Sequence, residues 1–222
     1  MEYVKVCGLK KMEDIKLCIE EGANAIGFIY NVPESPRNLE KSVLLDLLKK
    51  VPKNIKSVIT FRASSAVEVE KIMNEIDADL FQIHCNFNIR DFDRFPSVTK
   101  KKMIIALKTN QVNKGDVIKM INQSFDQFFS FLIDNSEGSG TEIDHELVLE
   151  IRRRTAGSKI IIAGGINIDN IEFLIKNLEP YGIDASSSLE SKKGVKDPIK
   201  IKLFLKKIKE VKKRIVRDKY EI

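Results

Sequence analysis

The sequence predicts a single (β/α)8 barrel, the TIM-barrel fold, that spans residues 1–222 as one domain. Short apolar runs rich in β-branched residues alternate with longer helical patterns from one end of the chain to the other. Eight strand-and-helix pairs in 222 residues are typical of a compact barrel of this kind. No Pro-, Ser- or Gly-rich linker divides the chain. The alternative, a doubly wound open sheet, usually has about five or six strands, so two runs would need another explanation.

The predicted elements follow one another in regular order. The strands are expected at residues 3–7, 25–30, 56–61, 80–84, 103–108, 128–134, 159–163 and 183–186. The helices are expected at residues 11–21, 39–50, 66–76, 89–95, 116–124, 145–154 and 169–178, with a last helix after residue 200. In the first helix, for example, Ile15, Cys18 and Ile19 fall on one face.

Composition excludes several classes of protein. With 43% hydrophobic and 32% charged residues the chain can bury a full core, which excludes disordered and collagen-like chains. No run approaches the roughly 18–20 apolar residues that span a bilayer, so no membrane association is expected. Residues 1–5 include an acid and no apolar segment, so no signal peptide is expected there.

The cysteines are three, an odd number, and they are widely spaced at Cys7, Cys18 and Cys85. Neither a disulfide framework nor a zinc site follows from that spacing, and Cys18 and Cys85 are interpreted as core or loop residues. We expect a protein of the reducing cytoplasm without a bound metal.

The net charge of +6 raises the question of a nucleic-acid partner. The excess is concentrated after Lys200, where Ile201, Phe204, Leu205 and Ile208 recur at helical spacing between lysines. This pattern predicts an amphipathic C-terminal helix with a solvated basic face. Aromatic residues make up 7% of the chain and Trp is absent, which argues against a base-stacking surface. No nucleic-acid partner is expected.

In a barrel of this kind the active site lies at the carboxyl ends of the strands. The polar and small residues at the predicted strand ends are Cys7-Gly8, Tyr30 with the loop to Arg37, Phe61-Arg62, Gln82-Ile83-His84, Lys108, Asp134 with Gly138-Ser139-Gly140, Gly164-Gly165 and Ser186-Ser187-Ser188. These positions are the candidates for substrate contact.

Most of these residues have an ordinary structural interpretation beside the functional one. Cys7 suits either chemistry or a buried core, and Gly8 either a close ligand approach or a sharp turn. Asp134 ends an apolar strand, where a carboxylate is costly to desolvate, but it could instead cap the loop that follows. Arg37 is either an anion clamp or a solvated loop charge. A structural role is the commoner one for a residue like His84.

Two clusters of small residues point to phosphate. Gly164-Gly165 follows the seventh strand, and Ser186-Ser187-Ser188 follows the eighth. Barrel phosphate sites are often assembled from these two loops, whose backbone N–H groups face the anion. The alternative is two tight turns. A phosphorylated small-molecule substrate is therefore expected.

Several ordered motifs resemble those of the phosphoribosylanthranilate isomerase family. They are VKVCGL at 4–9, AIGF at 25–28, SPR at 35–37, FQIH at 81–84, LID at 132–134, GSGT at 138–141, AGGI at 163–166 and DASSSLE at 184–190. The match runs in order from the first strand to Lys196-Asp197 and covers essentially the whole chain.

The resemblance implies an activity and a set of roles. The activity is the Amadori rearrangement of N-(5-phosphoribosyl)anthranilate to 1-(2-carboxyphenylamino)-1-deoxyribulose 5-phosphate, a cofactor-independent step of tryptophan biosynthesis. Cys7 would be the general base, Asp134 the general acid, and Arg37 the partner of the anthranilate carboxylate. The phosphate loops would fall on Gly165 and on Ser186-Ser187. Gly8 and His84 are further expected substrate contacts, and the protein is expected to be a monomer or homodimer.

Rival interpretations make different demands on the sequence. The related Amadori isomerase of histidine biosynthesis uses an aspartate where Cys7 stands. A metal-dependent sugar-phosphate epimerase would need several histidines, and only His84 and His145 are present. A nucleic-acid binder would use the basic helix and show steeply salt-dependent affinity. A degenerate, non-catalytic barrel would not need both Cys7 and Asp134.

Overall fold

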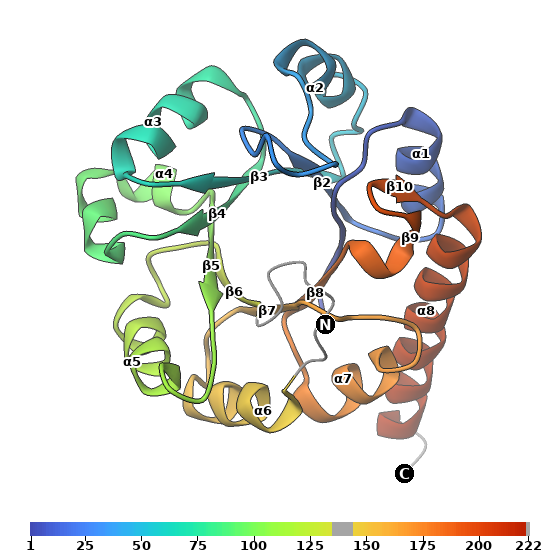
Figure 1. The fold of residues 1–222 in the computed structure, drawn as a ribbon. Coiled ribbons are helices and arrows are strands. Elements are labelled where there is room, and N and C mark those ends of the chain that lie inside the picture. The colour runs from blue at the N-terminus through green and yellow to red at the C-terminus, as the bar shows by residue number, and fades with distance from the viewer. Residues whose placement is uncertain (135–143, 221–222) are drawn as a thin grey trace.

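The computed structural model describes residues 1–134 and 144–220, and in them eight parallel strands close into a barrel ringed by helices (Figure 1). The strands are β1 (Tyr3–Val6), β2 (Ala25–Ile29), β3 (Lys56–Ala63), β4 (Leu80–Cys85), β5 (Met103–Lys108), β6 (Ser130–Asp134), β7 (Ile160–Ala163) and β8 (Gly182–Ala185). Each pairs with its neighbours in chain order, and β8 pairs with β1 to close the ring. The predicted barrel is confirmed, and the open sheet is excluded.

Helices follow the strands around the outside of the barrel. They are α1 (Met12–Glu20), α2 (Lys41–Leu48), α3 (Ala66–Glu75), α4 (Ser97–Lys100), α5 (Lys114–Ser124), α6 (His145–Arg154), α7 (Ile171–Leu178) and α8 (Pro198–Tyr220), with 3-10 helices η1 (Ile89–Arg94) and η2 (Ser187–Leu189). No helix in the part of the chain that the structure describes is long and apolar enough to cross a bilayer.

Two local predictions were wrong or incomplete. The predicted helix at 89–95 is the 3-10 helix η1 followed by the short α4. Pro96 lies between them, and because it has no N–H and a fixed φ it prevents one continuous helix. The sequence also gave no sign of the hairpin β9 (Glu190–Lys192) and β10 (Val195–Lys196), whose turn contains Gly194 at φ 80°. The predicted strand-end residues Gly138-Ser139-Gly140 lie outside the described residues.

The core has two layers because strand side chains alternate in direction. Residues such as Val4 and Phe61 belong to the larger cluster, which includes the buried faces of the helices. Residues such as Tyr3, Leu80 and Leu132 form a separate apolar cluster. On each of these strands a polar residue follows two positions later, nearer the carboxyl end of the strand. This second cluster is the floor inside the barrel.

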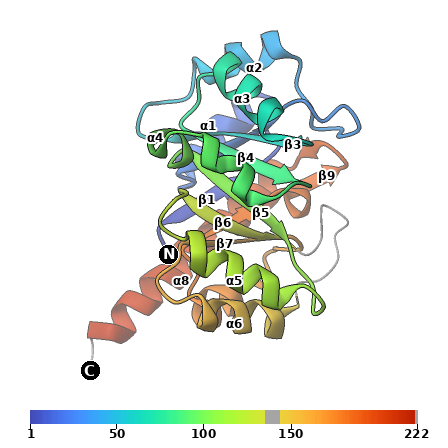
Figure 2. The ribbon, with the colours of Figure 1, turned by 90° about the vertical axis from the view of Figure 1, so that its left-hand side faces the viewer.

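The last helix, α8, is amphipathic as predicted. Its buried residues are Ile201, Phe204, Leu205, Ile208 and Val211. It packs against α1, α7 and η2, and Figure 2 shows its C-terminal end extending past the barrel. Its N-terminus is fixed by Asp197, whose carboxylate accepts hydrogen bonds from the backbone N–H groups of Ile199 and Lys200.

The burial of α8 predicts a large difference between two leucines that are two residues apart. Leu205 is 1% exposed and Leu203 is 51% exposed. Leu205→Ala should lower the free energy of unfolding by about 2–5 kcal/mol because it leaves a cavity, whereas Leu203→Ala should change it by less than about 1 kcal/mol. Urea unfolding of both variants measures this, and equal losses would show that α8 does not dock as described.

Candidate active site

A cavity of about 290 Å³ opens at the carboxyl ends of the barrel strands. Its walls come from the ends of β1, β3, β4, β6 and β8 and from the loops after β2 and β7. Of the predicted site residues, Cys7, Arg37, His84, Asp134, Gly165, Ser186 and Ser187 line it. Gly8 does not line it but lies directly after Cys7 and packs under Arg37. The barrel therefore brings together residues spread over 180 positions of the chain.

The inward-facing positions become more polar along several of the strands. On β4 they are Leu80 in the apolar floor, then Gln82, then His84 at the cavity. On β1 the same two-residue step leads from Tyr3 through Lys5 to Cys7. A layer of buried polar side chains thus separates the apolar floor from the cavity.

The centre of that polar layer is Lys5, whose side chain is fully buried. Its ammonium donates hydrogen bonds to Asp184 Oδ2 at 2.8 Å, Gln82 Oε1 at 2.9 Å and Thr60 Oγ1 at 3.4 Å. Burial alone would lower the pKa of Lys5, but the charges of Asp184 and then Cys7 outweigh burial and raise it. Lys5 is therefore a permanent positive charge beneath the cavity.

Cys7 lies at the end of β1 and is 4% exposed. Its Sγ is 3.5 Å from Thr60 Oγ1, and its backbone N–H donates to Ala185 O at 2.9 Å. The neighbouring strand leaves room for it only because residue 27 is glycine. A Cβ there would lie 2.8 Å from Cys7 Sγ and 2.6 Å from Lys5 Cε, both closer than non-bonded atoms approach each other.

Asp134 ends β6, on another side of the cavity from Cys7. Around the barrel β7 and β8 separate β6 from β1. A molecule in the cavity can thus touch a thiol and a carboxyl group from two different directions. This is the arrangement that an acid and a base acting on one substrate require.

His84, on β4, also borders the cavity and lies 3.3 Å from the Gln82 amide through its Nε2. Burial lowers the pKa of His84 below the ordinary 6.5, although the Asp134 charge opposes this. His84 is thus a neutral hydrogen-bonding group near pH 7 rather than a charge.

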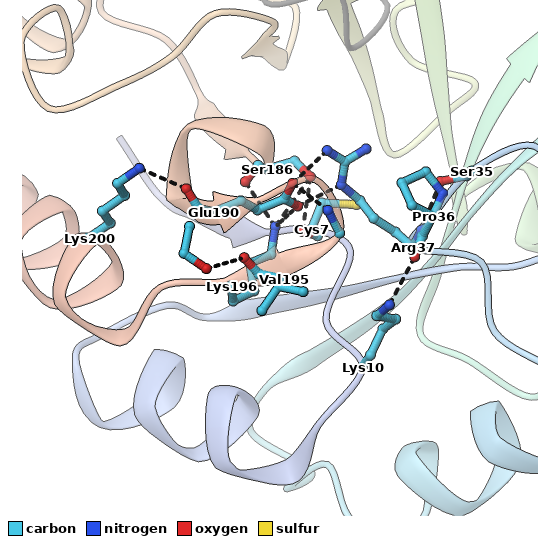
Figure 3. Close-up of polar contacts among 12 residues, drawn as sticks. Cys7, Lys10, Ser35, Pro36, Arg37, Ser186, Glu190, Val195, Lys196 and Lys200 are labelled. Atoms are coloured by element: carbon cyan, nitrogen blue, oxygen red, sulfur yellow. Dashed lines mark hydrogen bonds and ion pairs between the residues drawn. The ribbon is translucent and has the colours of Figure 1, made fainter.

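Arg37, in the loop after β2, is an ordered side chain and not a solvated loop charge. Its side chain is 12% exposed. The guanidinium binds Glu190 through two parallel hydrogen bonds, Nε to Oε1 at 2.6 Å and Nη2 to Oε2 at 2.8 Å (Figure 3). Glu190 also binds Lys196 at 3.0 Å. Burial disfavours the ionised carboxyl, but Arg37, Lys196 and the Gly194 N–H outweigh burial and lower the pKa of Glu190 to about 2.

The loops after β7 and β8 border one part of the cavity. Gly164 and Gly165 have φ of 81° and 63°, a conformation that other residues rarely adopt. Ser186, Ser187 and Ser188 line the same cavity, and the Ser188 hydroxyl is buried without a hydrogen-bond partner among the described residues. Backbone N–H groups and hydroxyls are donors suited to an oxyanion.

Sequence reasoning missed the charged residues that support the site, namely Lys5, Asp184, Glu190 and Lys196. A signal was present for two of them, because Lys5 and Asp184 each interrupt an otherwise apolar strand. No cluster of three or more His, Cys, Asp or Glu side chains that could hold a metal occurs within residues 1–134 and 144–220.

Comparison with known proteins relates the chain to one enzyme family. The family model of N-(5'-phosphoribosyl)anthranilate isomerase matches residues 4–207. A protein of that name from Listeria innocua is 34% identical over 214 residues, which cover 94% of this chain and 98% of the relative.

Solved structures give the same fold. One, of monomers generated from the dimeric phosphoribosylanthranilate isomerase of Thermotoga maritima, superposes with a TM-score of 0.79 at 23% identity and covers 95% of this chain and 100% of its own. Another phosphoribosylanthranilate isomerase, in complex with reduced 1-(o-carboxyphenylamino)-1-deoxyribulose 5-phosphate, gives 0.77 at 24% identity with the same coverage.

The lowered pKa of Glu190 predicts how stability changes with acid. An unfolded glutamate titrates near 4.5, so as pH falls from there towards about 2 the unfolded chain takes up a proton that the folded protein does not. The folded state should lose about 3 kcal/mol from this group over that range.

Glu190→Gln should remove this loss, because the amide does not titrate. The unfolding free energies of the wild type and the variant, measured with denaturant, should differ near neutral pH and converge as pH approaches about 2. A difference that stays constant over the range would mean that the carboxylate is not held by the two cations.

Proposed function

Because the chain belongs to the N-(5'-phosphoribosyl)anthranilate isomerase family, we propose that it rearranges N-(5-phosphoribosyl)anthranilate to 1-(2-carboxyphenylamino)-1-deoxyribulose 5-phosphate. The observation that carries the detailed proposal is the cavity that the Cys7 thiol, directly after β1, and the Asp134 carboxyl group at the end of β6 both border. We assign Cys7 as the general base and Asp134 as the general acid.

The two ends of the substrate have matching donors in this cavity. We place the phosphate against the loops of Gly165 and Ser186-Ser187, with Lys193 also at the cavity wall. The anthranilate carboxylate then binds Arg37, whose planar guanidinium suits a carboxylate. Held at both ends, the sugar carbons lie between Cys7 and Asp134, where orientation lowers the barrier.

The reaction needs one acid and one base. Asp134 protonates the furanose ring oxygen while the anilinic nitrogen lone pair forms a C=N bond to C1′ and the C1′–O bond breaks. Cys7, as a thiolate, then removes the proton from C2′ and gives an enolamine, which tautomerises to the ketone. C1′ is reduced while C2′ is oxidised within the same molecule, so no external oxidant or reductant is needed, and the atoms of substrate and product are the same.

The surroundings of the two groups suit these roles. The Lys5 ammonium lies beneath Cys7 and interacts with its thiolate form. A neighbouring cation stabilises a thiolate, which is the form of cysteine that can accept a proton. Asp134 shares the cavity with the neutral His84, which offers a hydrogen bond without a competing charge. We propose that His84 and the backbone at Gly8 complete the substrate contacts.

We also propose that residues 1–222 act as one domain in the cytoplasm, as a monomer or homodimer, on a phosphorylated small molecule rather than on nucleic acid. The relative from Thermotoga maritima is described as dimeric, with monomers generated from it. In this chain the basic residues of α8 alternate with a buried apolar face, as on a solvated helix of a barrel.

Genetic complementation tests the activity. Expressed in a bacterium that lacks this isomerase, the chain should restore growth on medium without tryptophan. The matched control is Cys7→Ala, which should fold and fail to restore growth. A folded, expressed wild-type chain that does not support growth would contradict the proposed function.

One prediction concerns Asp134, the proposed general acid. Asp134→Asn keeps the size of the side chain but cannot deliver an acidic proton, so kcat should fall by about 10²–10⁴-fold. Circular dichroism and the melting temperature serve as the control for folding. If the purified variant retains more than half of the wild-type activity, Asp134 has no part in the proton transfer.

Another prediction concerns Cys7, the proposed general base. Cys7→Ser is nearly isosteric but its hydroxyl is a far poorer base near neutral pH, so the variant should bind a product analogue normally and lose about 10²-fold or more in kcat. An alkylating agent should also inactivate the wild type, and a bound phosphate-bearing analogue should protect it.

The other cysteines provide the control for alkylation. Burial raises the pKa of Cys18 to about 12 and also raises that of Cys85, so neither thiol should react quickly. Full activity of Cys7→Ser, or unchanged turnover after Cys7 is alkylated, would require a different base.

A further inference from the structure

The carboxylate of Glu190 has all its acceptor positions occupied by this chain. Oε1 accepts from Arg37 Nε and Lys196 Nζ, and Oε2 accepts from Arg37 Nη2 and the Gly194 N–H at 2.9 Å. Glu190 is 6% exposed and is not among the residues that line the cavity. The Glu190 carboxylate therefore has no lone pair left to accept a hydrogen bond from a substrate. Its link to the cavity is its contact with Arg37, which lines the cavity wall.

The way in which Glu190 binds Arg37 leaves a defined edge of the guanidinium unused. The bidentate contact takes the Nε and Nη2 side of the plane. Among the described residues no acceptor takes the remaining donors, which are both hydrogens of Nη1 and the second hydrogen of Nη2. One hydrogen from each of these two nitrogens forms the end-on edge that suits a second carboxylate. Arg37 itself is a cavity wall residue, so this edge is the part of it available to a ligand.

The stem of Arg37 is fixed as well. At Gly8 a Cβ would lie 2.5 Å from Arg37 Cδ, so the arginine packs directly on the glycine backbone. Gly8 has φ 76°, a conformation that favours glycine for a second reason. The Gly8 backbone and the Glu190 carboxylate together hold the Arg37 side chain in one conformation. Without them the side chain would lose conformational entropy when it binds a ligand.

Lys196 determines the charge of this cluster. A pair of Arg37 and Glu190 alone would be neutral and would attract an anion only weakly. Lys196 Nζ faces three acceptors, Glu190 Oε1 at 3.0 Å, Ser186 O at 2.8 Å and Ser186 Oγ at 3.5 Å, which matches the three hydrogens of an ammonium. Burial lowers the pKa of Lys196, and the charge of Glu190 and its hydrogen bond oppose this. With Lys196 charged, the three side chains sum to one positive charge. The side chain of Lys196 is 2% exposed, so water screens this charge little.

We propose that Glu190 is a positioning residue that holds Arg37 with its end-on edge towards the anthranilate carboxylate, and that Lys196 keeps the cluster positive. This inference rests on the proposed function, because it takes Arg37 as the carboxylate-binding residue. Glu190 acts on the substrate only through Arg37. The hairpin β9–β10, which carries Glu190, Gly194 and Lys196, is thus the support of the substrate-binding arginine (Figure 3).

A double-mutant cycle with two ligands tests this. The probes are reduced 1-(o-carboxyphenylamino)-1-deoxyribulose 5-phosphate and the same compound without its carboxyl group. Their dissociation constants are measured by calorimetry for the wild type, Arg37→Ala, Glu190→Gln and the double variant. Glu172→Gln is the matched control, because Glu172 also binds several cations and also has a pKa of about 2, but lies on α7 outside the cavity wall.

The expected changes are specific for the carboxylate. Arg37→Ala should weaken the carboxylated ligand by about 10- to 100-fold, the scale of a charged hydrogen bond, and hardly affect the other ligand. Glu190→Gln should weaken the carboxylated ligand by about 3- to 10-fold, since the arginine must now be ordered on binding. In the double variant Glu190→Gln should add no further loss. Glu172→Gln should change neither ligand.

In steady-state kinetics Glu190→Gln should raise KM more than it lowers kcat, because it acts on binding and not on the proton transfers. If Arg37→Ala weakens both ligands equally or neither, the carboxylate assignment of Arg37 fails and the inference with it. Arg37→Ala can behave as expected while Glu190→Gln weakens the binding of both ligands alike, or weakens it as much in the Arg37→Ala background as in the wild type. Either result would overturn only the inference about Glu190.

Discussion

The buried ammonium of Lys5 is the interaction around which the upper half of the barrel is arranged. An isolated charge inside a protein is very costly, so three acceptors must converge on it, and they come from β3, β4 and β8. Lys5 thereby links β1 to its neighbour β8 and, across the barrel interior, to β3 and β4. Its hydrogen bonds form the layer at which the apolar floor ends. Everything above this layer can be polar, because the layer itself supplies hydrogen-bond partners such as Thr60 for Cys7.

Above that layer the fold distributes the tasks of the reaction among different strands. The proposed base and acid come from β1 and β6, and the proposed anion-binding groups from the loops after β2, β7 and β8. The support of the site is continuous: Ser186 Oγ donates to Cys7 O at 3.1 Å, and Lys196 links Ser186 to Glu190 and so to Arg37. Ser186, Cys7 and Arg37, which we propose for the phosphate, the sugar and the carboxylate, are thus joined by one connected network that keeps their spacing constant.

Much of this could be predicted from the sequence, and the exceptions have physical reasons. All eight strands were predicted because each is a distinct apolar run. Cys7 and Asp134 became candidates because strand ends form the site in a barrel, and the family resemblance supplied their expected roles. The segment expected as an α-helix at 89–95 forms a 3-10 helix instead, because its periodicity is only two turns long and Pro96 directly after it prevents the helix from continuing into α4. Glu190 and Lys196 gave no local signal, since two charges near a turn are normally solvated. Only the closure of the barrel, which brings Glu190 across 153 positions to Arg37, buries them.

The most direct test of the account is a crystal structure of this protein with reduced 1-(o-carboxyphenylamino)-1-deoxyribulose 5-phosphate bound. The account predicts Cys7 Sγ within about 3.5 Å of the sugar carbon that corresponds to C2′. It also predicts Asp134 within about 3.2 Å of the oxygen released from the furanose ring, and the carboxylate of the ligand on the free edge of Arg37. A ligand that is bound in the cavity with both Cys7 and Asp134 on the same side of the sugar, or with the thiol more than about 5 Å from that carbon, would contradict the assignment of base and acid.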